Sequence, residues 1–234
     1  RLLRDHGVAD GERVAVVSRN RPALVDLFFA CGKTGGVLAP LSHRLAAREL
    51  GELLADVAPE LLVVEAPFVD AVAGALAHVD TEITVRSLPA DNAGAKEYDS
   101  FLEERPEDES PVETADLSMD DPALFLHTGG STGVPKETVL THGSLLWNSF
   151  NTITAWGLRE DDTTPMVFPM FHTGGWNVLT LPLFHMGATV VIAREFDPAE
   201  VLSLVERTGS TVLVAVPAVL RMMTEHDEWD ETDL

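Results

Sequence analysis

The chain has 234 residues, 45% of them hydrophobic and 6% aromatic, so it can bury a substantial core without disulfides or metals. Its 38 acidic and 16 basic residues give a formal net charge of -22, which disfavours nucleic acid and anionic membranes as partners. No apolar run reaches the roughly 18 residues that a membrane-spanning helix needs, so we expect no integral membrane segment.

Basic side chains are mostly arginine, because Lys33, Lys96 and Lys136 are the only lysines. A carboxylate-rich surface with few lysines is typical of halophiles, in which concentrated salt screens the self-repulsion of the surface. An ordinary acidic protein is the alternative. The single cysteine, Cys31, has apolar neighbours that predict a packed core residue rather than a nucleophile. It cannot form an internal disulfide, so we expect a cytoplasmic protein.

Apolar strand-like runs alternate with helical patterns along most of the chain, which is typical of βαβ units. In chain order we expect strand 13–18, helix 21–35, helix 45–57, strand 61–65, helix 68–79, strand 82–88, strand 123–128, helix 143–156, strand 164–170, strand 188–193, helix 198–208 and strand 210–216. The predicted fold class is α/β, with mostly parallel, doubly wound sheets and helices on both faces.

One polar and acidic stretch, residues 89–120, contains few residues able to build a core. We interpret it as a linker that closes an upstream α/β subdomain over residues 1–120. A second α/β subdomain, residues 121–234, then opens with a strand. The chain ends at WDETDL without a recognisable closing element, so we expect it to be a truncated part of a longer protein.

The most informative segment is TGGSTGVPK, residues 128–136, which directly follows an expected strand. Its glycines let the backbone approach a ligand closely, so that successive N–H groups can converge on phosphate oxygens. Hydroxyl donors and a lysine add to this, as expected of an anion-binding loop. The candidate phosphate-contacting residues are Thr128, Gly129, Gly130, Ser131, Thr132, Gly133 and Lys136.

The residues of this loop allow comparison with three other kinds of segment. A polar hairpin turn with a solvated lysine stays open from the residues alone. A Walker-type loop fails because Lys136 is followed by Glu137 rather than Ser or Thr, and the Gly-Lys-Thr at 32–34 lacks the leading glycine. The segment 129–133 also matches G-x-S-x-G, with His226 as a conceivable triad partner, but Pro135 opposes the helix that must follow a nucleophile elbow.

The loop resembles the phosphate-binding signature of the adenylate-forming superfamily, T-S-G-T-T-G-x-P-K-G followed by V-x-L-T-H. Here VLTH stands at 139–142, while Gly129 replaces the usual serine and Glu137 replaces the closing glycine. Upstream, GERVAVVSRN and an E-L helix are similar to the same superfamily. The resemblance covers nearly the whole chain and is strongest to the amino-terminal part of acyl-CoA synthetases.

Downstream, FPMFHTGGWNVLTLPLFHMGATVVI resembles the segment that lines the acyl pocket in acyl-CoA synthetases. The resemblance implies that His172 faces the bound acyl group and the adenylate. Gly174 and Trp176 are further candidates for the acyl pocket, although a helix-start histidine and a core tryptophan are the alternatives. His127, His142 and His185 have no metal-ligand spacing, so we assign no protein metal site and no catalytic side chain.

The implied reaction converts a small-molecule carboxylic acid and ATP, with Mg²⁺, to an acyl-adenylate and then to a coenzyme A thioester. A fatty acid is the preferred substrate; an aryl acid, another adenylating activity and a non-catalytic nucleotide-binding module are the alternatives. The superfamily's Y-G-x-T-E motif and late lysine are absent, since Tyr98 precedes the loop and no lysine follows Lys136. The isolated chain is therefore expected to be inactive. A homodimer is compatible with the sequence.

Overall fold

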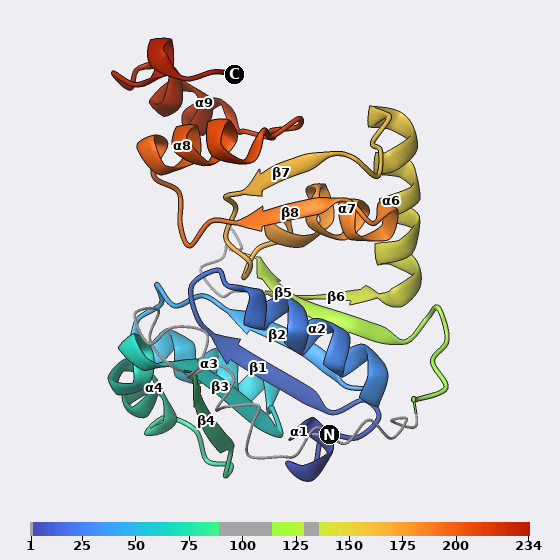
Figure 1. Ribbon diagram of the computed structural model, residues 1–234. Helices are drawn as coiled ribbons and strands as arrows, with labels where there is room; N and C mark the ends of the chain where they lie inside the picture. Colours follow the sequence, from blue (N-terminus) through green and yellow to red (C-terminus); the bar gives the residue numbers. More distant parts are fainter. Residues whose placement is uncertain (1, 89–113, 129–135) are drawn as a thin grey trace. The chain divides into compact units, whose positions relative to one another are not determined.

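The computed structural model describes residues 2–88, 114–128 and 136–234 (Figure 1). These residues form two compact units: Arg1–Arg19 with Ala23–His142, and Asn20–Pro22 with Gly143–Leu234. The sequence places the start of the second subdomain at residue 121, whereas the strands on both sides of 129–135 join the sheet of the first unit. Apart from Asn20–Pro22, the second unit therefore begins within the helix that follows those strands.

The first unit is built on a six-stranded sheet of order β4-β3-β1-β2-β5-β6. All neighbouring strands are parallel except β5 and β6, which form an antiparallel pair at one edge. Its elements are α1 (Leu2–Asp5), β1 (Arg13–Val17), α2 (Pro22–Thr34), β2 (Val37–Leu41), α3 (Ala47–Val57), β3 (Leu61–Glu65), η1 (Ala66–Phe68), α4 (Val69–Leu76), β4 (Thr84–Leu88), β5 (Pro122–Thr128) and β6 (Lys136–Thr141).

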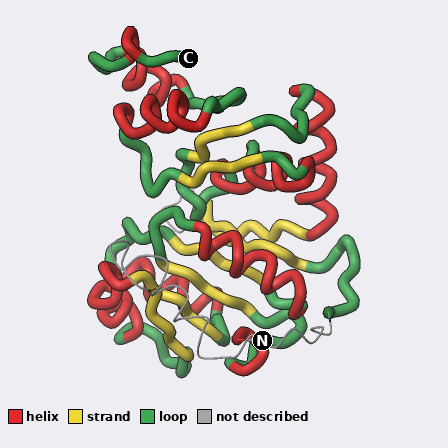
Figure 2. The backbone as a smooth tube through the Cα atoms, viewed as in Figure 1, coloured by secondary structure: helices red, strands yellow, loops and turns green. Residues whose placement is uncertain are grey.

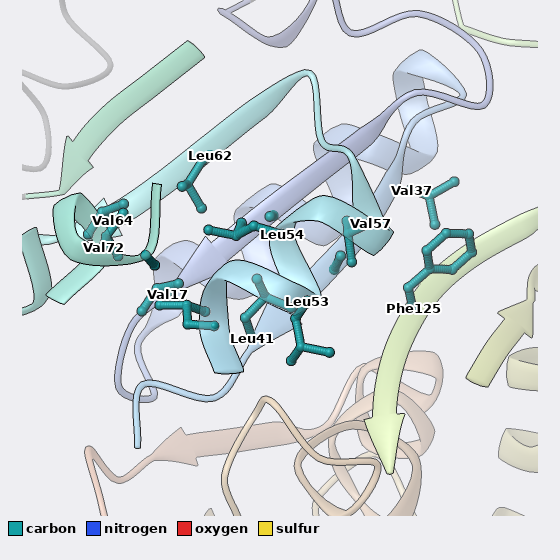
Figure 3. Close-up of a cluster of buried hydrophobic side chains, with 14 residues drawn as sticks. Val17, Val37, Leu41, Leu53, Leu54, Val57, Leu62, Val64, Val72 and Phe125 are labelled. Atoms are coloured by element: carbon teal, nitrogen blue, oxygen red, sulfur yellow. The ribbon is translucent and has the colours of Figure 1, made fainter. Parts of the chain in front are cut away.

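Strand order dictates where the helices lie. The chain moves from β1 to β2 in one direction and from β2 to β3 in the other, so right-handed crossovers put α2 and α3 on opposite faces of the sheet. The step from β3 to β4 keeps the second direction, which brings α4 to the same face as α3. Alternate residues of the strands pack against α3 and α4 in one core that includes Val17, Leu41, Leu54, Val64 and Val72 (Figure 3).

The second unit contains a two-stranded parallel sheet of β7 and β8, with helices before, between and after the strands (Figure 2). Its elements are α6 (His142–Trp156), β7 (Thr163–Met166), the π-helix η3 (Gly174–Val178), α7 (Thr180–Met186), β8 (Thr189–Ile192), α8 (Pro198–Thr208), α9 (Pro217–Thr224) and the short η4 (Trp229–Glu231). Buried side chains of α8 pack with Val167 and Ala193, just beyond β7 and β8.

The parallel sheet with helices on both faces in the first unit confirms the predicted fold class. The expected strand at 210–216 is wrong, because Thr211 and Val212 both donate their N–H to the same carbonyl, that of Thr163, and no ladder follows. Strands β2 and β6 were not predicted. Pro40 interrupts the apolar pattern of β2, and β6 is a polar, largely exposed edge strand. Every helix in the described part of the chain is too short or too polar to span a bilayer.

Candidate functional site

The predicted phosphate loop joins the two antiparallel strands β5 and β6. Thr128 and Lys136 are register partners at the ends of these strands, and the Thr128 hydroxyl donates to the Lys136 carbonyl oxygen over 3.3 Å. Both residues are exposed. The five other candidates, Gly129, Gly130, Ser131, Thr132 and Gly133, lie outside the described residues. The strand pair therefore fixes the two ends of the loop close together and presents Lys136 at its mouth.

His127 and Glu137 form the next pair of register partners below the loop. Burial is the main cause that lowers the pKa of His127 and raises the pKa of Glu137, and the nearby carboxylate of Asp56 raises the pKa of both residues. Burial thus disfavours the charged form on each side of the pair. Glu137 stands where the adenylate-forming signature has glycine, and its side chain is partly buried beside the loop.

Strand β6 argues against the interpretation of the loop as the nucleophile elbow of a serine hydrolase. A nucleophile elbow passes from its serine directly into a helix. Here the described chain resumes after the loop as strand β6, and a helix begins only at His142. The serine hydrolase interpretation of 129–133 is therefore wrong.

A second group of candidates lies in the turn between β7 and the π-helix η3. His172 is exposed there, and its Nδ1 atom accepts the Gly174 N–H over 3.1 Å. A neutral imidazole whose Nδ1 accepts a hydrogen bond carries its proton on Nε2. The backbone closes the turn with hydrogen bonds from His172 N to Pro169 O and from Gly175 N to His172 O, both 3.0 Å. His172 can thus offer a donor at Nε2 to a ligand.

The glycine pair in this turn has two different roles. A Cβ atom added to Gly174 would meet His172 and Phe168 at ordinary contact distances of 3.4 Å. A Cβ atom on Gly175 would lie 2.6 Å from Pro169 O and 2.7 Å from Met170 Cα, which are backbone atoms. Gly175 therefore permits the close approach of the π-helix to the turn, while the partly buried Gly174 would accept a methyl group in ordinary contact with His172 and Phe168.

Trp176, the third candidate for the acyl pocket, lies beneath the turn. Its side chain has an exposed fraction of 0%, and its Nε1 atom donates to the Met170 carbonyl oxygen over 2.6 Å. An acyl group could touch the indole only if other atoms moved aside. The described arrangement therefore gives Trp176 the position of a support under the turn, which agrees with the core-packing alternative.

A small cavity borders this turn within the second unit. Its volume is about 10 Å³, far below the range of roughly 300–1,000 Å³ that is typical of ligand pockets, so in this arrangement it has no room for an acyl group. The lining is mainly apolar: Thr164, Pro165, Met166, Phe168, Gly174, Val178, Leu179 and Val214. An apolar group could enter beside Gly174 only if some of these side chains moved aside, and it would then contact mainly hydrocarbon.

Two features of this site escaped prediction. The π-helix was not predicted, because the glycine pair gives no helical periodicity. Asn20 was not predicted either; it stands in the polar run 18–21 after strand β1, and in the structure its 4% exposure and its long-range hydrogen bonds distinguish it from an ordinary loop asparagine. No group of three or more His, Cys, Asp or Glu residues that could hold a metal ion occurs among the residues that the structure describes.

Comparisons with known proteins agree with these features. Two curated relatives are the indoleacetate–CoA ligase of Aromatoleum aromaticum, 37% identical over 99% of this chain, and the long-chain-fatty-acid–CoA ligase FadD13 of Mycobacterium tuberculosis, 31% identical over 97%. The chain covers 45% and 44% of their respective lengths, so it spans less than half of each.

A similar solved structure is that of ATP-bound MatB from Rhodopseudomonas palustris, with a TM-score of 0.79 and 28% identity. The match covers 97% of this chain and 43% of that one. The family model of the AMP-binding enzymes matches residues 1–234, the whole of the present chain. Through its strands, its glycine-rich loop and the His172 turn, the chain belongs to the family of AMP-binding enzymes.

Proposed function

We propose that the full-length gene product is an AMP-forming ligase that joins a carboxylic acid to coenzyme A with ATP. The observation that carries this proposal is the β5–β6 strand pair, which holds Lys136 exposed at the mouth of a loop with the phosphate-binding signature. Membership of the AMP-binding enzymes and the CoA ligase names of the two relatives support it.

The proposed chemistry proceeds in two balanced steps. A carboxylate oxygen attacks the α-phosphorus of MgATP, the bond to the β-phosphate oxygen breaks, and pyrophosphate leaves. The thiolate of coenzyme A then attacks the acyl carbon, and AMP leaves. Loop N–H groups, the hydroxyls of Ser131 and Thr132, and the Lys136 ammonium would hold and neutralise the departing pyrophosphate. Mg²⁺ belongs to the nucleotide substrate in this scheme.

The His172 turn is the part of the chain that we assign to the acid. The Nε2 atom of the exposed His172 can donate to an oxygen of the carboxylate or adenylate, and the apolar side chains beside Gly174 would suit a hydrocarbon or aromatic group once they move apart. A long-chain fatty acid is our preferred substrate, and an aryl acid is the second candidate, favoured by the indoleacetate–CoA ligase relative. We also infer a cytoplasmic location and a surface adapted to high salt, from the buried Cys31 and the net charge of -22.

The experiment is acid-dependent exchange of labelled pyrophosphate into ATP by the full-length gene product. Palmitate, a mid-chain fatty acid, indoleacetate and a hydroxycinnamate are compared at equal concentrations, with an acid-free reaction as the control. Exchange that requires one of these acids supports the proposal, and the acid with the highest kcat/KM identifies the substrate class. Exchange absent with all of them, in a folded protein that binds ATP, supports a non-catalytic nucleotide-binding module.

A further inference from the structure

We propose that Asn20 is a positioning residue for acid binding, because its side chain holds the His172 turn in place. This inference rests on the proposed function of that turn. Asn20 lies far from the turn in sequence, but it packs in the second unit with the segments that follow strands β7 and β8. It is 4% exposed, so its amide depends on protein partners rather than on water.

Both N–H donors and the oxygen of the Asn20 amide bond to the backbone around the turn. Its Nδ2 atom donates to the carbonyl oxygens of Phe168, at 2.9 Å, and Ala193, at 3.1 Å. Its Oδ1 atom accepts the Met170 N–H at 2.8 Å. A flipped amide would place oxygen against two carbonyl oxygens, so the partners themselves determine its orientation.

These bonds join the carboxyl ends of two parallel strands. Phe168 and Met170 follow β7, whereas Ala193 directly follows β8. In parallel α/β sheets, ligands bind beyond the carboxyl ends of the strands, so a turn that binds a ligand there needs a rigid support. The Asn20 carbonyl is itself held by Arg194, whose Nη1 donates to it over 2.9 Å.

The contacts continue from Asn20 to His172. Met170 is held on both sides of its backbone, because Asn20 accepts its N–H and Trp176 donates to its carbonyl oxygen. Pro169, between the two residues bonded to Asn20, accepts the N–H of His172. Removing the amide would deprive the Met170 N–H and the two carbonyls of the hydrogen bonds from Asn20. The turn that carries His172 would then lose its rigid support.

Only a side chain with two N–H donors and one acceptor can bond to both carbonyl oxygens and to the Met170 N–H. Alanine at position 20 removes the donors and the acceptor. Serine keeps one hydroxyl, which can donate to one carbonyl or accept the Met170 N–H but cannot replace the whole amide. We therefore expect a graded series, with the wild type best, Asn20→Ser intermediate and Asn20→Ala worst.

The experiment measures pyrophosphate exchange and thermal melting for the full-length gene product and its Asn20→Ala and Asn20→Ser variants. The matched control is Asp162→Ala. Asp162 is 7% exposed in the same unit and accepts from Arg159 N–H and the Thr211 hydroxyl at 2.7 and 2.8 Å, but it does not contact the turn. We expect Asn20→Ala to raise the KM for the acid about tenfold and to change the KM for ATP by less than about twofold. Asp162→Ala should lower the melting temperature and leave both KM values within about twofold.

The result that overturns the inference is an Asn20 variant that loses stability while its KM for the acid stays at the wild-type value, as in the control. Equal increases in both KM values would overturn it too, because they would indicate general damage. If Asn20→Ala does not fold, Asn20→Ser is judged by the same criteria. A wild-type protein without acid-dependent exchange would refute the proposed function, and the inference with it, whereas a failure confined to the Asn20 variants refutes the inference alone.

Discussion

Cys31 shows how burial determines the chemistry of one side chain. It is 0% exposed in α2, and desolvation raises the pKa of its thiol to about 12. The thiolate that reacts with alkylating agents is therefore almost absent at neutral pH. We expect no labelling by iodoacetamide at pH 8 in the native chain and complete labelling in urea. Mass spectrometry of both samples checks this, and rapid native labelling would contradict the core position of Cys31.

Among the candidate site residues, the sequence could predict the type of side chain better than its surroundings. Lys136 and His172 were found from local motifs and are exposed, as a binding role requires. Trp176 was found from the same motif but lies fully buried, because its indole fills the space below the turn. Asn20 has partners 148 and 173 residues away, and no local pattern encodes contacts at that distance.

At the scale of one element, the start of the π-helix depends on the size of residue 175. Gly175→Ala should destabilise the protein by about 1 to 3 kcal/mol, since its methyl group would overlap backbone atoms that can move only together. Gly174→Ala is the matched control, because its added methyl would make ordinary contacts. Urea unfolding of both variants measures the difference. Equal stabilities would mean that the close approach at Gly175 is absent.

Predictability of the elements followed the strength of their local signals. Helix α8 was predicted with its exact bounds, because Asp197 caps it and Pro198 occupies its first position; the Asp197 side chain accepts the Glu200 N–H over 3.0 Å. The segment 210–216 has a strong β-propensity, yet it forms no strand, since a strand also needs a neighbouring strand with which to form a ladder of hydrogen bonds. Strand β2 contains a proline and is nevertheless central, because neighbouring strands pair along both of its edges.

At the scale of a whole unit, three histidines couple the stability of the first unit to pH. Burial is the first cause that lowers the pKa of His43, His127 and His142. The folded state then binds protons more weakly than the unfolded chain, whose histidines have a pKa of about 6.5. The stability they contribute is present above that pH and is lost as pH falls through it toward the lower folded values.

We therefore expect the urea midpoint of the chain to fall between pH 7.5 and pH 5.5. His127→Gln should reduce the size of that fall, because it removes one of the linked protons. His78→Gln is the control, since His78 belongs to the same unit and is exposed. A midpoint that rises on acidification would contradict the assignment of neutral, partly buried histidines.

The charge of the whole molecule makes a prediction about salt. With a net charge of -22, carboxylates repel one another over the surface, and added salt screens this repulsion. The melting temperature should rise as KCl increases from 0.05 M toward 2 M. The salt bridges Arg48–Glu52 and Arg159–Asp161 are exposed, so their small contribution to stability would change little when salt screens them. A melting temperature that stays flat or falls would remove the interpretation of a salt-adapted surface.

The most direct test of the central claim is pyrophosphate exchange by Lys136→Ala in the full-length gene product, beside thermal melts and the control Lys33→Ala, which removes another exposed lysine. If Lys136 contacts the leaving pyrophosphate, kcat/KM for ATP should fall by the equivalent of about 2 to 4 kcal/mol. Its effect on stability should stay under about 0.5 kcal/mol, as for an ordinary surface residue. Lys33→Ala should exchange like the wild type. Wild-type exchange by Lys136→Ala would show that the loop at 128–136 does not use its lysine on phosphate, and would contradict the account.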